Sequence, residues 1–296
     1  MVEEYTPLQE QLEYAGHDVH ELDLKDFILS HPNLERFRGT PQGILSLIDE
    51  FKRTRNCPLQ PSNHKARIIG DLVAHRRPTV MIEMGGYVGY SAILFGEVFF
   101  KQGIDNGCIF SLEPNHRYGE VAKFLIDLAG LSNFVEVMTG PTDASIRNLL
   151  SLGFEKVDFM LVGYDNLACT PSLKLFEELK MVSPGTVIVV DNSTFSGNKP
   201  YMEYVRSSVE EKREIVKRLE STDIFNMSTI LATIDPEVRA GNPNLKYVTW
   251  PMDGTGPAWS MVGQIPFLIF GATQADLHRA SLKLSNVLER KKTPRP

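Results

Sequence analysis

Apolar and polar positions follow two alternating patterns along the middle of the chain. From residue 77 to about residue 218, short continuous apolar runs alternate with longer stretches whose apolar residues recur at helical spacing. The runs predict buried strands at 79–84, 107–112, 134–139, 157–163 and 185–190. The stretches between them predict helices at 89–101, 115–129, 142–152, 171–181 and 199–219. This alternation is typical of an α/β fold, in which helices flank a mostly parallel sheet.

The segments on either side are less regular. Residues 1–78 contain no convincing strand, and helical spacing recurs at 9–22, 43–54 and 65–75. Towards the other end, two further strands are predicted at 245–252 and 258–262, joined as an antiparallel hairpin, with a last helix at 275–289. We therefore predict seven strands in one sheet and the following organisation: a helical cap over 1–78, a compact α/β domain over 79–290, and a tail over 291–296.

One stretch, VMIEMGGYVGYS at 80–91, organises the candidate chemistry. Its glycines allow the backbone to approach a ligand closely, and Glu83 can hold a sugar or an ammonium group. Glu113 ends the next predicted strand, where an acidic residue can accept both hydroxyls of a ribose. The loop lacks the G-x-G-x-x-G spacing and a Walker lysine, and Glu83 would repel a pyrophosphate. A ligand without phosphates, such as S-adenosylmethionine, is favoured over a dinucleotide; a packing turn without a ligand is the alternative.

Composition and charge limit the partners. A net charge of -6 gives no reason to expect nucleic acid or an anionic membrane as a partner, and the longest apolar runs have only the length of strands. Cys57, Cys108 and Cys169 are odd in number and far apart, which predicts reduced thiols in a cytoplasmic protein, and the polar N-terminus argues against a secretion signal. The seven histidines show no metal-ligand spacing. The pattern leaves the oligomeric state open.

The stretch 83–91 closely resembles the adenosylmethionine loop of catechol O-methyltransferases. The similarity continues through Leu112–Asn115, Gly140–Asp143 and Gly185–Asn192, and HPNLE at 31–35 resembles the N-terminal extension of fungal members. It covers the chain from about residue 25 to residue 265. The resemblance implies a Rossmann-like class I methyltransferase fold that uses S-adenosylmethionine.

The resemblance also implies roles for individual residues. Glu83 would bind the methionine ammonium of the cofactor and Ser91 its carboxylate, while Gly85 and Tyr87 would line the cofactor. Glu113 would bind the ribose, and Thr142, Asp143 and Tyr164 would lie beside the adenine. Asp191 and Asn192 match two of the family's magnesium ligands.

The acceptor half departs from the family pattern. Gly163 stands where the family has its first magnesium-binding aspartate, Asn166 where it has its catalytic lysine, and Trp259 lies in the segment that should supply a substrate-binding glutamate. Magnesium needs hard oxygen ligands in near-octahedral geometry, so loss of a carboxylate predicts that magnesium is not used. Asp165 replacing the lost ligand is the minority alternative.

Several residues remain candidates for catalysis or substrate binding on the acceptor side, and some of them also have a purely structural explanation. Catalytic candidates are Tyr164, Asp165, Asn166 and Asp191, and substrate-binding candidates are Lys65, Asn192 and Trp259. Asp191 is equally well explained as a loop-stabilising carboxylate. For Asp165 a solvated loop charge is favoured over a base, whereas for Trp259 a substrate platform is favoured over edge-strand packing.

The sequence thus predicts methyl transfer from S-adenosylmethionine to a small molecule, at oxygen and without magnesium. An acidic or apolar acceptor resembling a secondary metabolite fits better than catechol, because both catechol contacts are changed. Two alternatives remain: a cofactor-binding protein that cyclises or rearranges its substrate, and a binding protein without catalysis.

Overall fold

The computed structural model describes residues 18–55, 63–163, 169–190, 199–221, 239–251 and 267–271. These residues fall into two compact units. The first takes the described residues up to Leu152 together with Leu161–Gly163, and the second takes Gly153–Met160 together with the described residues from Cys169 onwards.

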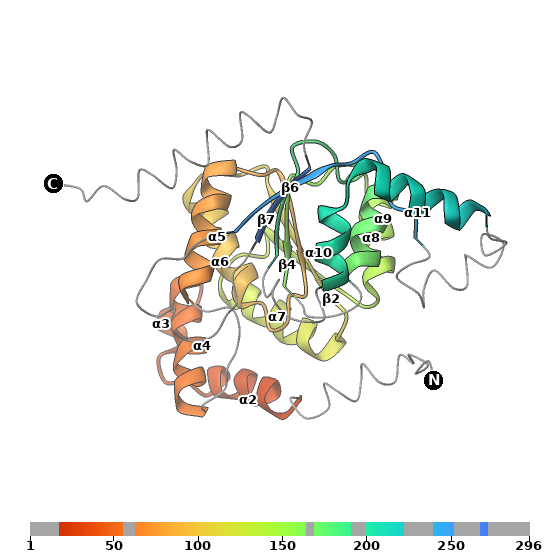
Figure 1. Ribbon diagram of the computed structural model, residues 1–296. Helices are drawn as coiled ribbons and strands as arrows, with labels where there is room; N and C mark the ends of the chain where they lie inside the picture. Colours follow the sequence, from red (N-terminus) through yellow and green to blue (C-terminus); the bar gives the residue numbers. More distant parts are fainter. Residues whose placement is uncertain are drawn as a thin grey trace. The chain divides into compact units, whose positions relative to one another are not determined.

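The first unit begins with helices and continues as an α/β alternation (Figure 1). Its elements are α2 (Asp18–Leu29), α3 (Leu34–Phe37), α4 (Pro41–Arg55), α5 (Asn63–Arg76), β1 (Val80–Met84), α6 (Tyr90–Lys101), β2 (Cys108–Glu113), α7 (His116–Leu128), β3 (Val135–Thr139) and α8 (Thr142–Ser151). Strands β1 and β2, and β2 and β3, pair in parallel. The predicted strands at 79–84, 107–112 and 134–139 are thereby confirmed.

Burial explains why these strands could be recognised. Every residue of β1 and β2 after the first is buried, as expected for parallel strands covered on both faces. Helix α6 packs against α4 and α5, and α7 packs against β2 and β3. The described chain is thus a Rossmann-like arrangement, a parallel sheet flanked by helices.

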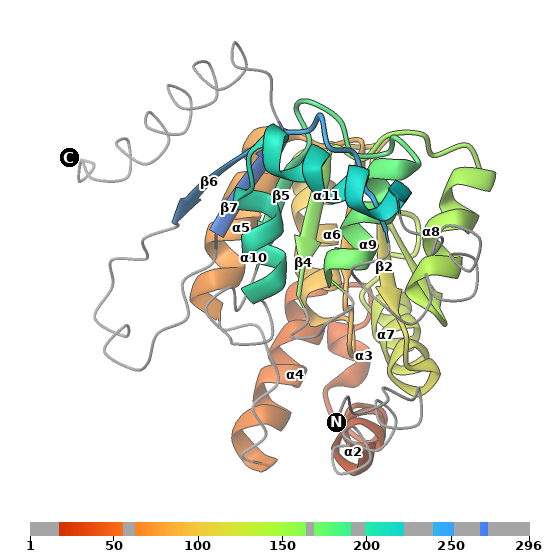
Figure 2. The ribbon, with the colours of Figure 1, turned by 45° about the vertical axis from the view of Figure 1, so that its right-hand side comes forward.

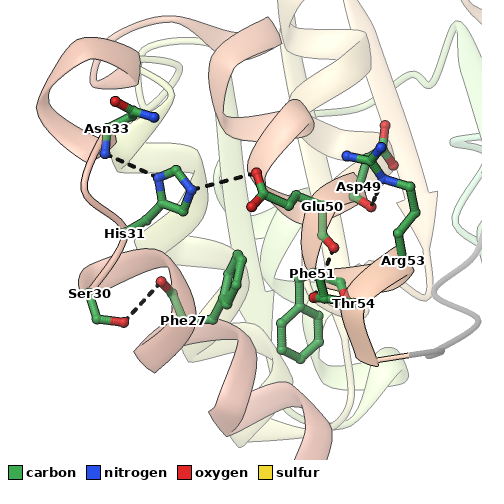
Figure 3. A network of polar contacts seen from close by, with 9 residues as sticks. All are labelled: Phe27, Ser30, His31, Asn33, Asp49, Glu50, Phe51, Arg53 and Thr54. Atoms are coloured by element: carbon green, nitrogen blue, oxygen red, sulfur yellow. Dashed lines mark hydrogen bonds and ion pairs between the residues drawn. The ribbon is translucent and has the colours of Figure 1, made fainter.

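The N-terminal helices pack on the rest of this unit through α4. Its apolar stripe is almost completely buried and consists of Ile44, Leu47, Ile48 and Phe51. His31 accepts a bond from the Asn33 amide at 3.2 Å and lies 3.5 Å from Glu50 (Figure 3). On its other side α4 reaches α6, where the Tyr90 hydroxyl donates to Asp49 at 3.3 Å. No strand occurs among the described residues before β1, as the sequence predicted.

The second unit holds α9 (Cys169–Glu178), β5 (Val187–Val190), α10 (Lys199–Arg206), α11 (Val209–Ser221), β6 (Tyr247–Pro251) and β7 (Phe267–Gly271). Strand β7 pairs antiparallel with both β5 and β6, and Figure 2 shows the blue strands β6 and β7 side by side. Strand β4 (Phe159–Val162) has residues in each unit, because Phe159 and Met160 belong to the second and Leu161 and Val162 to the first.

One sequence prediction needs correction here. The single helix expected at 199–219 is two helices, because Ser208 begins a new one. The Glu211 amide donates to the Ser208 hydroxyl at 3.1 Å, and the Ser208 amide donates to the Glu211 carboxylate at 2.7 Å. This reciprocal pair is a capping box, and its S-x-x-E signature was present in the sequence.

Strand β7 was not predicted, although Phe267–Phe270 is an apolar run bounded by Pro266 and Gly271. The predicted strand at 258–262 and the predicted helix at 275–289 lie outside the described residues. The strand predicted at 245–252 is confirmed as β6, and its antiparallel partner is β7.

A buried polar network centred on Glu177 lies inside the second unit. Its carboxylate accepts bonds from the hydroxyls of Tyr204 and Tyr247 and, at 2.7 Å, from the Asn242 amide. The ammonium of Lys212 lies 4.3 Å from the Tyr204 ring centre and 4.5 Å from that of Tyr247. Burial raises the pKa of Glu177 and lowers the pKa of Lys212 to about 8. The network ties α9, α10 and α11 to the start of β6.

Candidate functional site

The loop between β1 and α6 is held against the rest of the first unit by its own backbone. The Gly85 amide donates to the Leu112 carbonyl at 2.9 Å, and the Gly89 amide donates to the Gly86 carbonyl at 2.9 Å. Gly89 has a φ of 85°, and a Cβ there would lie 3.0 Å from the Ala122 Cβ, so only glycine fits without strain. The loop therefore lets its backbone approach a ligand at the end of β1 closely.

Tyr87 adopts a backbone conformation that is unusual for a residue with a side chain, with a φ of 48°. Its amide donates to Glu113 Oε2 at 2.7 Å, and its ring meets the Tyr118 ring edge-on at a centroid distance of 4.9 Å. These contacts compensate the backbone strain, and they attach the loop to β2 and α7.

Glu83 is fully buried, and one of its carboxylate oxygens has no partner. Oε2 accepts a 2.6 Å bond from the Ser111 hydroxyl, whereas Oε1 has no hydrogen-bond partner. Burial raises the pKa of Glu83, while hydrogen bonds from Ser111 and Ser91 act against this rise. An unpaired buried oxygen is costly and rare in folded proteins. The position of Oε1 is therefore suited to accept a bond from a cationic group of a ligand.

Glu113 is a second buried carboxylate at the same end of the sheet, and its side chain is fixed by two backbone amides. Oε1 accepts from Asn115 at 2.8 Å, and Oε2 accepts from Tyr87 at 2.7 Å. Each carboxylate oxygen has a further lone pair, so this residue can also accept two ligand hydroxyls. Burial raises its pKa to about 7; the two backbone hydrogen bonds oppose this shift, and the charge of Glu83 adds to it.

The raised pKa of Glu113 makes the stability of the ligand-free protein depend on pH. Between its usual value of 4.5 and about 7, the folded state keeps a proton that the unfolded chain has already released. The free energy of unfolding should therefore fall as pH rises through this window, by at most about 1.4 kcal/mol per pH unit from this group. Denaturant unfolding of wild type and Glu113→Gln from pH 5 to pH 7.5 measures the difference, and equal slopes would contradict the prediction.

The start of α8 closes this end of the site. The Gly140 amide donates to the Glu113 carbonyl at 3.0 Å, which fixes the loop after β3 against the end of β2. Thr142 is buried in the first turn of α8, and Asp143 is half-buried beside it. Ser91, in the first turn of α6, is also buried. The predicted cofactor residues within the described chain thus belong to one unit, at the ends of β1 and β2 and in the loop and helix segments that follow β1 and β3.

The acceptor half of the predicted site lies largely outside the described residues: Tyr164, Asp165, Asn166, Asp191, Asn192 and Trp259. Lys65 belongs to α5, but its side chain is also outside the described part. Gly163 is described. Its amide donates to the Met84 carbonyl at 2.9 Å, and a Cβ at this position would lie 3.3 Å from that same oxygen.

Sequence reasoning missed Ser111 and Asn115 as supports of the two carboxylates. Ser111 lies two residues before Glu113 on a strand, so alternation could have placed both side chains on one face.

Among the residues that the structure describes, no group of three or more His, Cys, Asp or Glu side chains could hold a metal ion. None of the described helices is long and apolar enough to span a membrane.

A parallel sheet with a glycine loop and acidic residues at the strand ends is typical of α/β proteins that bind nucleosides. A family model described as O-methyltransferase matches residues 44–236, and the chain belongs to this family.

Catechol O-methyltransferases are among its similar relatives. The bovine (Bos taurus) enzyme is 25% identical over 182 residues, which cover 61% of this chain and 65% of the relative. Catechol O-methyltransferase B of zebrafish (Danio rerio) is 29% identical over 172 residues, which cover 58% of this chain and 64% of the relative. The matched part of this chain thus spans slightly less than two thirds of each of these relatives.

The fold is shared with solved methyltransferase structures. The S-adenosylhomocysteine-bound methyltransferase PaMTH1 of Podospora anserina aligns with a TM-score of 0.50 at 16% identity, covering 78% of this chain and 88% of that one. This likeness supports the Rossmann-like fold of the described residues.

Proposed function

We propose that this protein transfers a methyl group from S-adenosylmethionine to an oxygen atom of a small molecule. The observation that carries the proposal is the pair of buried carboxylates at the ends of β1 and β2. Glu83 presents an unpaired oxygen, and Glu113 is held by two backbone amides with lone pairs to spare. Adenosylmethionine carries both an ammonium and a ribose, which are the two groups that such carboxylates can bind.

The assignment of the cofactor residues follows this chemistry. Glu83 binds the ammonium and Ser91 the carboxylate of the methionine part, Gly85 and Tyr87 line the ligand, and Glu113 accepts the ribose hydroxyls. Thr142, Asp143 and Tyr164 lie beside the adenine in this proposal. Bound adenosylmethionine supplies a methyl group activated by its sulfonium, so the protein's main task is to align acceptor oxygen, methyl and sulfur.

On the acceptor side, we propose a site without magnesium. Glycine at position 163 offers no ligand, and its tight packing on Met84 leaves little room for a side chain. Tyr164, Asp165, Asn166 and Asp191 stay candidates for proton handling. Lys65, Asn192 and Trp259 stay candidates for acceptor contacts, and an acidic or apolar acceptor suits this set.

We also propose that the strands form one seven-stranded, mostly parallel sheet. We propose further that the protein is a cytoplasmic enzyme without nucleic-acid or membrane partners. The names of the similar catechol O-methyltransferases support the reaction class, while the changed residues argue for a different acceptor.

Calorimetric titration with S-adenosylmethionine and S-adenosylhomocysteine tests the cofactor half. We expect both to bind in a one-to-one complex, and absence of binding would refute the proposed function. Labelled adenosylmethionine is then incubated with a panel of phenols and carboxylic acids. Binding without transfer to any acceptor would favour the alternatives, a rearranging enzyme or a non-catalytic binding protein.

Magnesium removal gives a separate prediction for the acceptor half. Methyl transfer to the best acceptor in the panel should continue at an unchanged rate in excess EDTA, because Gly163 cannot contribute a ligand. A magnesium-dependent catechol O-methyltransferase in the same buffer serves as the control that the chelator works. Strict dependence on added magnesium would show that other residues, Asp165 first among them, restore a metal site.

A further inference from the structure

Ser111 and Gly86 occupy one small volume beside Glu83, although they come from different elements. Ser111 and Glu83 are partners in the register of β2 and β1, and both are completely buried. Gly86 belongs to the loop after β1. A Cβ at position 86 would lie 1.9 Å from the Ser111 hydroxyl oxygen, a distance that no packing arrangement allows. The missing side chain of Gly86 therefore makes room for the Ser111 hydroxyl.

This arrangement determines which oxygen of Glu83 is left for a ligand. The Ser111 hydroxyl has a single hydrogen, and it donates that hydrogen to Oε2 at 2.6 Å. Hydrogen bonds to an ionised acceptor are short and strong, so this contact fixes the carboxylate rotamer. The other oxygen, Oε1, is buried and has no hydrogen-bond partner.

We propose that Ser111 is a positioning residue for the cofactor's ammonium group: it holds Glu83 so that Oε1 faces the ligand, and Gly86 makes this contact possible. The inference rests on the proposed function, since it requires a ligand with an ammonium group at this place. It adds a residue outside the glycine loop, and it gives Gly86 a packing role that does not depend on a left-handed backbone.

The electrostatics of Glu83 agree with this role. Burial raises the pKa of Glu83, and hydrogen bonds from Ser111, the larger of the two effects, and Ser91 lower it, so Ser111 helps to keep the carboxylate ionised. Without the hydroxyl, Glu83 retains its proton to a higher pH and pairs less well with an ammonium group.

Two ligands distinguish a positioning role of Ser111 from a general role in supporting the loop. S-adenosylhomocysteine carries the amino-acid part with its ammonium, whereas 5′-methylthioadenosine has the same adenosine and sulfur but lacks that part. For Ser111→Ala we expect the affinity for adenosylhomocysteine to fall about tenfold or more, from the loss of a charge-assisted bond. The affinity for methylthioadenosine should stay within about twofold of wild type, because Glu113 and its supports are unchanged.

Two further measurements sharpen the comparison. The pH at which adenosylhomocysteine affinity reaches its plateau should move upward in Ser111→Ala. Ser111→Cys, which has nearly the same size but is a weak donor, should show the same selective loss. It replaces the alanine variant if circular dichroism shows that the latter does not fold.

Variants at Gly86 and Ser111 together form a double-mutant cycle. Gly86→Ala alone should weaken both ligands, because the new methyl group displaces the loop or Ser111. The double variant Gly86→Ala/Ser111→Ala removes the clashing oxygen, so methylthioadenosine affinity should recover while adenosylhomocysteine affinity stays as low as in Ser111→Ala. Non-additivity of this size is expected for residues in direct contact.

The outcomes distinguish this inference from the proposed function. If wild type binds neither ligand, the proposed function fails and the inference fails with it. If wild type binds both, and Ser111→Ala either binds both unchanged or loses both equally, the inference alone is overturned. A selective loss for the ligand with an ammonium group, together with the double-variant recovery, supports it.

Discussion

Glu83→Gln should lower the affinity for S-adenosylhomocysteine by at least about thirtyfold, since removing one partner of a buried charge pair costs roughly 2–5 kcal/mol. The amide has the shape of the carboxylate, so the Ser111 bond to one side can persist. Its other side, however, carries an NH₂ group or a neutral oxygen where Oε1 is now unpaired. Calorimetry at pH 8 measures the loss. An unchanged affinity would mean that Oε1 does not contact the ligand.

Glu97→Gln is the matched control for this experiment. Glu97 is also a buried carboxylate of the first unit, but it is paired with Lys101 at 2.7 Å and with the Gln42 amide. The same chemical change there should leave ligand affinity within about twofold of wild type. Glu83→Gln should also unfold no more easily than wild type without ligand, because a neutral amide costs less to bury than a carboxylate. Loss of affinity with retained stability identifies a ligand contact.

The second large effect is expected on stability, from Glu177→Gln. The carboxylate accepts three bonds and neutralises Lys212, which is buried between two tyrosine rings. Glutamine keeps the volume but removes the charge and turns one acceptor into a donor facing other donors. Removing one partner of a buried ion pair costs about 3–5 kcal/mol, and we expect a loss of this size in denaturant unfolding.

Lys212→Met in the Glu177→Gln background tests the reason for this loss. If the cost arises from an uncompensated buried ammonium, the double variant should be more stable than Glu177→Gln alone. Tyr247→Phe, which removes a single donor to the same carboxylate, should cost about 1 kcal/mol and provides the scale. A cost below about 1 kcal/mol for Glu177→Gln would show that the network contributes little.

The strands were predictable where burial is uniform. Val80–Met84 and Cys108–Glu113 read as continuous apolar runs because both faces of each strand are covered. The same reasoning placed Glu83 and Glu113 at strand ends, since an acidic residue interrupts the run. Periodicity failed at Ser207 and Ser208, because the apolar spacing continues across a break that only the capping box reveals.

The supports of the site were harder to predict than the site itself. The role of Ser111 depends on the register that sets it opposite Glu83, and register is a property of strand pairing that no local pattern contains. The packing of Gly86 on Ser111 has the same origin. A glycine in a loop suggests backbone freedom, whereas here it reflects a neighbour far away in the sequence.

The unusual backbone of Tyr87 has a consequence for the kinetics of binding. Bonds within the protein, to Glu113 and Leu112, hold the loop in this strained conformation. Because these bonds do not involve the cofactor, the proposed binding of adenosylmethionine should require little ordering of the loop and lose little conformational entropy. If the proposed site is correct, association with the adenosine part should be limited by encounter, and the residence time should report how well the bound groups fit.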